Sequence, residues 1–285
     1  MAPKPNRAAG YRTSQVEYVR ATCLYLATKL GDLLDEIVIV GGLVPSLLID
    51  QQTVSPADER HVGTLDLDIG LALAILDDQR YQALTERLRQ AGFSEDTTDE
   101  GKPTRQRWRI DGPPKVTVDF LIPPSLPEDR PGKLRNIEKD FAAIIAPGLH
   151  LAFRDRERVL LDGRTILGEV ATREIWVAGP AAYVVLKALA FKSRGENKDA
   201  YDLFYVLRHF GQGTEDVVAR SAALLDDPYA KEAIAVLESD FSQVDSLGPR
   251  RVAEFLNGGP DDELEADVRN LVLDFVTGCK GERSG

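Results

Sequence analysis

The sequence predicts an α+β protein in which helices flank a mixed β-sheet and a helical C-terminal domain follows. Residues 36–40 form a short apolar run that is typical of a buried strand, and residues 65–73 include alternating acidic and apolar side chains. From Gly179 to the C-terminus, the apolar residues instead recur at helical spacing. Strands are therefore expected mainly in the first part of the chain and helices in the second.

Apolar spacing and turn residues predict the individual elements. Residues between Tyr18 and Leu34 have helical spacing, Gly92 is a natural helix stop, and the turn residues 111–114 separate two alternating runs typical of a hairpin. In chain order, we expect a helix over 12–34, a strand over 36–40, a helix over 43–49, the acidic strand over 65–73, a helix over 77–91, strands over 105–110 and 115–121 that form a hairpin or lie near each other, a proline-rich loop over 122–134, short strands near 149–153, 157–161 and 174–177, and helices over 179–193, 198–210, 214–225, 228–239, 248–256 and 261–277.

These elements divide the chain into three parts. With 285 residues, the chain is long enough for two domains with separate cores. Residues 1–10 are expected to form a disordered tail, residues 11–178 the domain that contains the sheet, and residues 179–285 a helical domain.

Composition restricts the classes of partner. The net charge of −11 argues against a general polyanion binder, so any nucleic acid would have to meet a local basic surface. Cys23 and Cys279 lack metal-ligand spacing, which argues against a zinc site or a disulfide framework. No apolar run follows the N-terminal charges, and the most apolar helix, 181–191, is short and contains Lys187. We therefore expect a cytoplasmic protein with no membrane partner.

The acidic strand is the strongest functional signal. Asp66 and Asp68 lie two residues apart, so a strand places both carboxylates on one face. Strand aspartates usually face solvent, but two on one face repel each other unless a positive charge lies between them. Asp119 shares a strand face with Thr117, and it could complete a metal site or act as a general base. We favour a site of three aspartates for Mg²⁺ over solvated strand acids.

The glycine pair Gly41-Gly42 precedes this strand. Taken alone, a helix entry or turn that needs unusual dihedral angles is the favoured interpretation. The functional interpretation is that two residues without side chains let a triphosphate approach the backbone, with Ser46 about one turn later as a phosphate contact or a cap.

A second group of charges lies in the helical part. Lys187 and Arg194 are seven residues apart and so lie on nearly the same helix face. Lys187 interrupts an apolar helix, where an ammonium is costly unless it is paired. It could contact a nucleotide phosphate, extend to solvent, or form a salt bridge with an acid such as Asp202. For Asp202 we weigh structural pairing and a catalytic role equally, and Asp199 could pair with the same cations.

Three arginines alternate along the strand at 105–110. Arg105, Arg107 and Arg109 would share one face and could bind a phosphate-bearing co-substrate. We slightly favour the alternative, a charged edge strand that discourages aggregation.

Together these motifs resemble the nucleotidyltransferase (DNA polymerase β-like) superfamily. The first set of motifs comprises Gly41-Gly42-x3-Ser46, Thr64-Leu65-Asp66-Leu67-Asp68 and Asp119. The later run is similar to the AbiEii-type toxins of type IV toxin–antitoxin systems. That run comprises Leu186-Lys187-Ala188-Leu189, Arg194 and Lys198-Asp199-Ala200-Tyr201-Asp202-Leu203.

The resemblance implies a Mg²⁺-dependent enzyme that transfers a nucleotide from an NTP such as ATP to an acceptor hydroxyl, in some relatives the 3′ end of tRNA. It also implies a cognate antitoxin protein as a partner. The expected metal ligands are Asp66, Asp68 and Asp119. The expected catalytic residues are these three with Lys187 and Asp202. The expected nucleotide-binding residues are Gly41, Gly42, Ser46, Thr64, Lys187 and Arg194. Alternatives are transfer to an aminoglycoside-type small molecule or to a protein, and a catalytically inactive binding protein.

Overall fold

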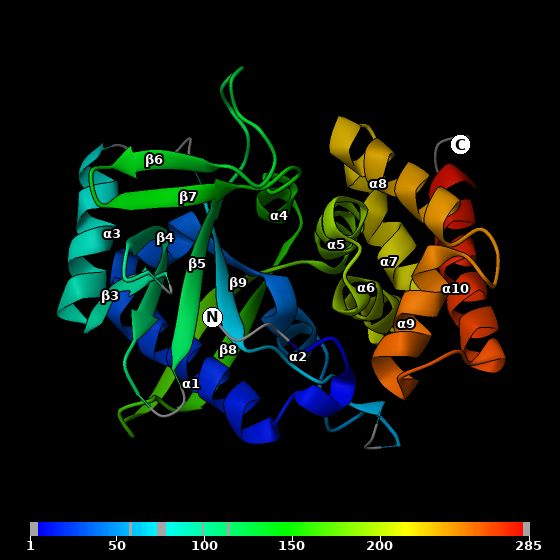
Figure 1. Ribbon diagram of the computed structural model, residues 1–285, viewed down its shortest axis with the longest axis horizontal. Helices are drawn as coiled ribbons and strands as arrows, with labels where there is room; N and C mark the ends of the chain where they lie inside the picture. The colour runs from blue at the N-terminus through cyan, green and yellow to red at the C-terminus, as the bar shows by residue number, and fades with distance from the viewer. Residues whose placement is uncertain (1–4, 57–58, 73–77, 99, 113–114, 282–285) are drawn as a thin grey trace. The chain divides into compact units, whose positions relative to one another are not determined.

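The computed structural model describes residues 5–56, 59–72, 78–98, 100–112 and 115–281, and it confirms the α+β fold class (Figure 1). The chain splits into two compact units. Within the described residues, the first contains 12–44 and 63–178, and the second contains 5–11, 45–62 and the chain from Gly179 onward. Within the residues described, no helix has the length and hydropathy needed to cross a membrane.

The first unit is built on one mixed sheet. Its main path runs β3-β4-β5-β2-β1-β9-β8, with β7 beside β5 and β6 beside β7. β2 pairs with β5 in parallel and with β1 in antiparallel orientation, so β2 lies in the interior of the sheet. The strands are β1 (Ile37–Val40), β2 (Asp66–Leu71), β3 (Phe93–Thr97), β4 (Pro103–Ile110), β5 (Val116–Ile122), β6 (Leu134–Glu138), β7 (Phe141–Ile145), β8 (Arg156–Arg164) and β9 (Val170–Ala178).

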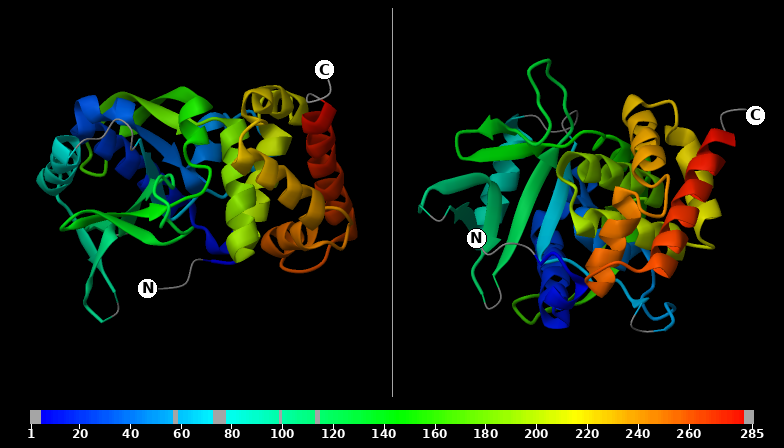
Figure 2. Two further views of the ribbon diagram at one scale, coloured as in Figure 1. Left: turned by 90° about the horizontal axis from the view of Figure 1, so that it is seen from above. Right: turned by 45° about the vertical axis from the view of Figure 1, so that its right-hand side comes forward.

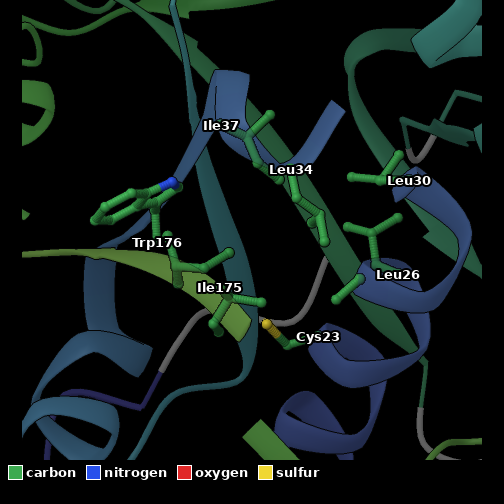
Figure 3. A pocket seen from close by; sticks show the side chains of 9 residues that line it. Cys23, Leu26, Leu30, Leu34, Ile37, Ile175 and Trp176 are labelled. Atoms are coloured by element: carbon green, nitrogen blue, oxygen red, sulfur yellow. The ribbon is translucent and has the colours of Figure 1, made fainter. Parts of the chain in front are cut away.

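Helix α1 (Thr13–Leu30) packs on one face of this sheet and contacts β2, β5, β8 and β9. Its apolar residues face Ile39 of β1 and Ile175 of β9 around a void of about 10 Å³ (Figure 3). Burial in this apolar layer raises the pKa of the Cys23 thiol to about 12. Because Ile39 is in register with Ile69, this face is opposite to the one that carries Asp68. The first unit also contains α3 (Asp78–Gln90) and α4 (Leu151–Arg154).

The second unit is helical. Its first two long helices, α5 (Pro180–Arg194) and α6 (Asn197–His209), lie side by side (Figure 2). Gly195 ends α5 in the left-handed conformation, with φ +63°. The later helices are α7 (Thr214–Ser221), α8 (Pro228–Asp240), α9 (Leu247–Asn257) and α10 (Asp262–Gly281). The short helix α2 (Val44–Leu48) begins at the last residue of the first unit.

Some local expectations differ from the structure. Residues 149–153 were expected to form a strand, but the structure contains turns and α4 there. The prediction was wrong because a hydrophobic pattern over only five residues is also compatible with one helical turn. β3, β6 and β7 were not expected. Within the expected disordered tail, residues 5–10 have a defined backbone with a 3₁₀ helix at Ala8–Gly10, and residues 1–4 lie outside the described residues.

Candidate metal centre

The register of the sheet brings three carboxylates together. Asp68 of β2 lies directly opposite Asp119 of β5, and Asp66 lies opposite Thr117. Residues opposite each other in neighbouring strands project from the same face, so all three aspartates share one surface of the sheet. Each contributes one carboxylate oxygen, and these three oxygens lie within 4.8 Å of one another. The predicted convergence of Asp66, Asp68 and Asp119 is therefore present.

This acidic cluster is largely removed from water. Asp66 and Asp119 are 3% and 4% exposed. The hydroxyl of Thr64 donates a hydrogen bond to Oδ1 of Asp66 at 3.0 Å, which orients that carboxylate. Solvated strand acids, the alternative interpretation of the sequence, do not describe such buried groups. Three carboxylates this close repel one another unless cations compensate them, so the donor set could hold a metal ion.

Gly41 begins the turn directly after β1 and has a specific role beside this cluster. It adopts a φ of +71°, and a Cβ atom built on it would lie 1.9 Å from Oδ2 of Asp68. Any larger residue would therefore collide with a carboxylate of the cluster. Gly42 is buried in the same turn. Ser46, the other expected phosphate contact, lies in α2 and belongs to the second unit.

Arg107 is a residue of the site that sequence reasoning did not select. It lies opposite Asp119 in the β4–β5 register, and its Nε donates to Oδ1 of Asp119 at 2.7 Å while Nη2 binds Oδ2. The interpretation of the arginine strand as a sheet edge is wrong, because β4 lies between β3 and β5. The alternating arginines were a visible signal, but only the sheet order shows which of them faces Asp119.

The second group of predicted residues forms a buried ion network within the helical unit. Nζ of Lys187 lies 3.0 Å from Oδ1 of Asp199 and 2.7 Å from Oδ2 of Asp202. Arg194 binds Asp199 through Nε and Nη2, and Nζ of Lys198 lies 2.6 Å from Asp202. This is the structural pairing that the sequence offered as an alternative for Lys187 and Asp202. Their catalytic roles, and nucleotide contacts by Lys187 and Arg194, stay predictions.

Burial and charge act in opposite directions on this network. Burial alone would raise the pKa of Asp202, but the ammonium groups of Lys187 and Lys198 hold it well below its usual range. Burial alone would lower the pKa of Lys187, but the carboxylates of Asp202 and Asp199 raise it. These residues are therefore charged in the folded protein at neutral pH.

His61 extends the same network from the segment before β2. Its Nε2 lies 2.8 Å from Oδ1 of Asp202, and its ring stacks on Tyr201 with centroids 5.4 Å apart. Its backbone N–H donates to Gln51 and Tyr205. Burial lowers the pKa of His61 to about 4, and the hydrogen bond with Asp202 only partly opposes that shift. His61 is therefore neutral at pH 7, with Nε2–H as the donor to Asp202.

The depressed pKa of His61 predicts loss of stability in mild acid. The unfolded chain binds a proton near pH 6.5 and the folded chain only near pH 4, so His61 contributes stability that is present above pH 6.5 and is lost as the pH falls toward 4. The loss should reach about 3 kcal/mol. The free energy of unfolding, measured by urea titration at several pH values between 4.5 and 7.5, should change less steeply with pH for His61→Gln than for wild type.

His209→Gln is the control for this prediction. His209 is only half-buried, and burial also lowers its pKa. His209→Gln should therefore reduce the pH dependence of the free energy of unfolding less than His61→Gln does. An unchanged slope in His61→Gln would show that His61 is not buried in its neutral form.

The chain matches no model of a known protein family and no curated protein.

Proposed function

We propose that the chain is a Mg²⁺-dependent nucleotidyltransferase that transfers a nucleotide from an NTP to a hydroxyl of RNA, with the 3′ end of tRNA as the expected acceptor. The observation that carries the proposal is the convergence of Asp66, Asp68 and Asp119 on one sheet face, with Gly41 against Asp68. Mg²⁺ is commonly held by one or two carboxylates together with substrate phosphates. The sequence resemblance supports the same reaction, and it adds an antitoxin protein as an expected partner.

The reaction would use the site residues in distinct roles. Bound metal ions would neutralise charge on the transferring phosphate and lower the pKa of the attacking hydroxyl. Asp66, Asp68 and Asp119 would hold them, with Thr64 keeping Asp66 in its orientation. The acceptor oxygen forms a bond to the α-phosphorus while the bond to pyrophosphate breaks, and Asp119 receives the hydroxyl proton. Gly41 would leave room for the Asp68 carboxylate beside the phosphates.

The test is incubation of the protein with each α-labelled NTP and Mg²⁺, together with total tRNA and an aminoglycoside as possible acceptors. We expect label on tRNA with wild type and none with Asp66→Ala. Label on the protein itself would overturn the RNA acceptor in favour of a protein, and label only on an added aminoglycoside would favour a small molecule. No label on any of these acceptors would overturn the enzyme assignment and favour a binding protein.

A further inference from the structure

The pairing of β4 with its two neighbours gives Arg107 an unusual position. Glu95 and Asp96 of β3 are adjacent, yet they pair with Trp108 and Thr104 of β4. Residues 105–107 are therefore extra residues in β4, a bulge opposite a regular strand. Hydrogen bonds fix this bulge, since Oγ1 of Thr104 donates to the carbonyl of Arg107 and Nε1 of Trp108 donates to that of Arg105.

On its other side β4 remains in register with β5. Arg107 lies opposite Asp119 there, in a row across the sheet that continues to Asp68. Bulges redirect side chains and are common beside active sites. The guanidinium of Arg107 binds both oxygens of Asp119, while the neighbouring Arg105 is exposed and reaches Asn136.

The ion pair between Arg107 and Asp119 compensates negative charge at the site. The side chains of Arg107 and Asp119 are 20% and 6% exposed, so little water screens them. Arg107 also interacts electrostatically with Asp66 and Asp68. It is thus a cation that compensates the whole carboxylate cluster. A metal ion held by the same three aspartates would compensate the same negative charges. Arg107 and the metal ion would therefore compete for Asp119.

We propose that Arg107 is a resident counter-cation of the site, and that its guanidinium is released from Asp119 to bind a phosphate of the nucleotide when Asp119 becomes a metal ligand. This inference rests on the proposed function and names a residue for binding the triphosphate. The chemistry is consistent, because the planar fork that binds a carboxylate through two hydrogen bonds also fits a phosphate.

The proposal predicts opposite effects of Arg107→Gln on two ligands. Without the competing charge, Mn²⁺ should bind at least about tenfold more tightly, as expected for a charge removed within a few ångströms of a partly buried site. In the presence of Ca²⁺, which supports binding without efficient transfer, ATP should bind about tenfold more weakly because one phosphate contact is lost. Mn²⁺ affinity is measured by electron paramagnetic resonance of the free ion, and ATP affinity by calorimetry.

Two further variants make the result specific. Arg105→Gln removes a charge of the same strand that does not bind Asp119, so both affinities should stay within about twofold of wild type. Arg107→Lys keeps the charge without the fork, so its Mn²⁺ affinity should stay closer to wild type than that of Arg107→Gln. Circular dichroism melts of each protein, with and without Mn²⁺, establish that the variants are folded.

The outcomes separate this inference from the proposed function. If folded Arg107→Gln binds Mn²⁺ as weakly as wild type or more weakly, Arg107 orients Asp119 for the metal and the counter-cation proposal is overturned. If its Mn²⁺ affinity rises but its ATP affinity is unchanged, the transfer of Arg107 to phosphate is overturned. If neither wild type nor Arg107→Gln binds Mn²⁺, the metal site itself is refuted, and this proposal with it.

Discussion

Asp68→Asn is expected to abolish divalent-metal binding and to reduce nucleotidyl transfer at least about a thousandfold. Asparagine keeps the shape of the side chain but removes the charge from the centre of the cluster, between Asp66 on its own strand and Asp119 opposite. A metal ion supplies several kcal/mol of transition-state stabilisation in such reactions, and about 4 kcal/mol corresponds to three orders of magnitude in rate. Mn²⁺ binding and transfer of labelled nucleotide measure the two effects.

The matched control for this variant is Asp162→Asn. Asp162 is an exposed strand aspartate of β8 in the same unit, and its replacement should change neither measurement. Metal binding that persists in Asp68→Asn at wild-type affinity would exclude Asp68 as a ligand.

Gly41→Ala reaches the same site without altering any carboxylate. The added methyl group would lie 1.9 Å from Oδ2 of Asp68, so Asp68 must move and metal affinity should fall. Gly92→Ala separates this effect from backbone strain, because Gly92 has a φ of +85° and a Cβ there would meet nothing within 4 Å. Both variants should lose about 1–2 kcal/mol of stability, but only Gly41→Ala should lose metal binding.

Local sequence patterns predict two of the three carboxylates of the candidate metal centre. The two-residue period of a strand places Asp66 and Asp68 on one face, and it needs no knowledge of the sheet. The contribution of Asp119 depends on β2 and β5 being parallel neighbours, although they are separated along the chain by α3, β3 and β4. That adjacency is a property of the whole sheet, so the sequence supports it only as a hypothesis.

The contact of Arg107 with Asp119 could not be predicted from the local sequence. An alternating row of arginines fits an edge strand and an interior strand equally well, and a bulge cannot be recognised from one strand alone. The short strands β6 and β7 were missed for a related reason. The pairing of β7 with β5 is non-local, and runs as short as Phe141–Ile145 do not distinguish strand from helix.

For Lys187, in contrast to Arg107, the sequence limited the possible environments of the side chain to a few. An ammonium in an apolar helix must be paired or reach water, and a salt bridge with an acid such as Asp202 was one of the alternatives that the sequence offered. The structure shows that pair and the expected pairing with Asp199, and it adds Lys198 and His61. His61 could not be foreseen, since 141 residues separate it from Asp202 along the chain.

Asp202→Asn is expected to lower the free energy of unfolding by about 3–5 kcal/mol, because removing one partner of a buried ion pair leaves the other charges uncompensated. The side chain of Asp202 is 0% exposed, and its oxygens lie within 2.8 Å of groups on Lys187, Lys198 and His61. After the substitution, Lys187 retains Asp199, whereas Lys198 loses the carboxylate to which it is bound. Urea unfolding followed by the helical circular dichroism signal measures the change.

Glu232→Gln provides the comparison, because Glu232 pairs with Lys192 at the surface of the same unit, where the two side chains are 41% and 55% exposed. Water and salt screen such a pair, so this variant should change stability by less than about 1 kcal/mol. Asp202→Asn with an unchanged urea midpoint and no transfer activity would instead assign Asp202 to catalysis. We expect the structural result, because both carboxylate oxygens are already engaged within the helical unit.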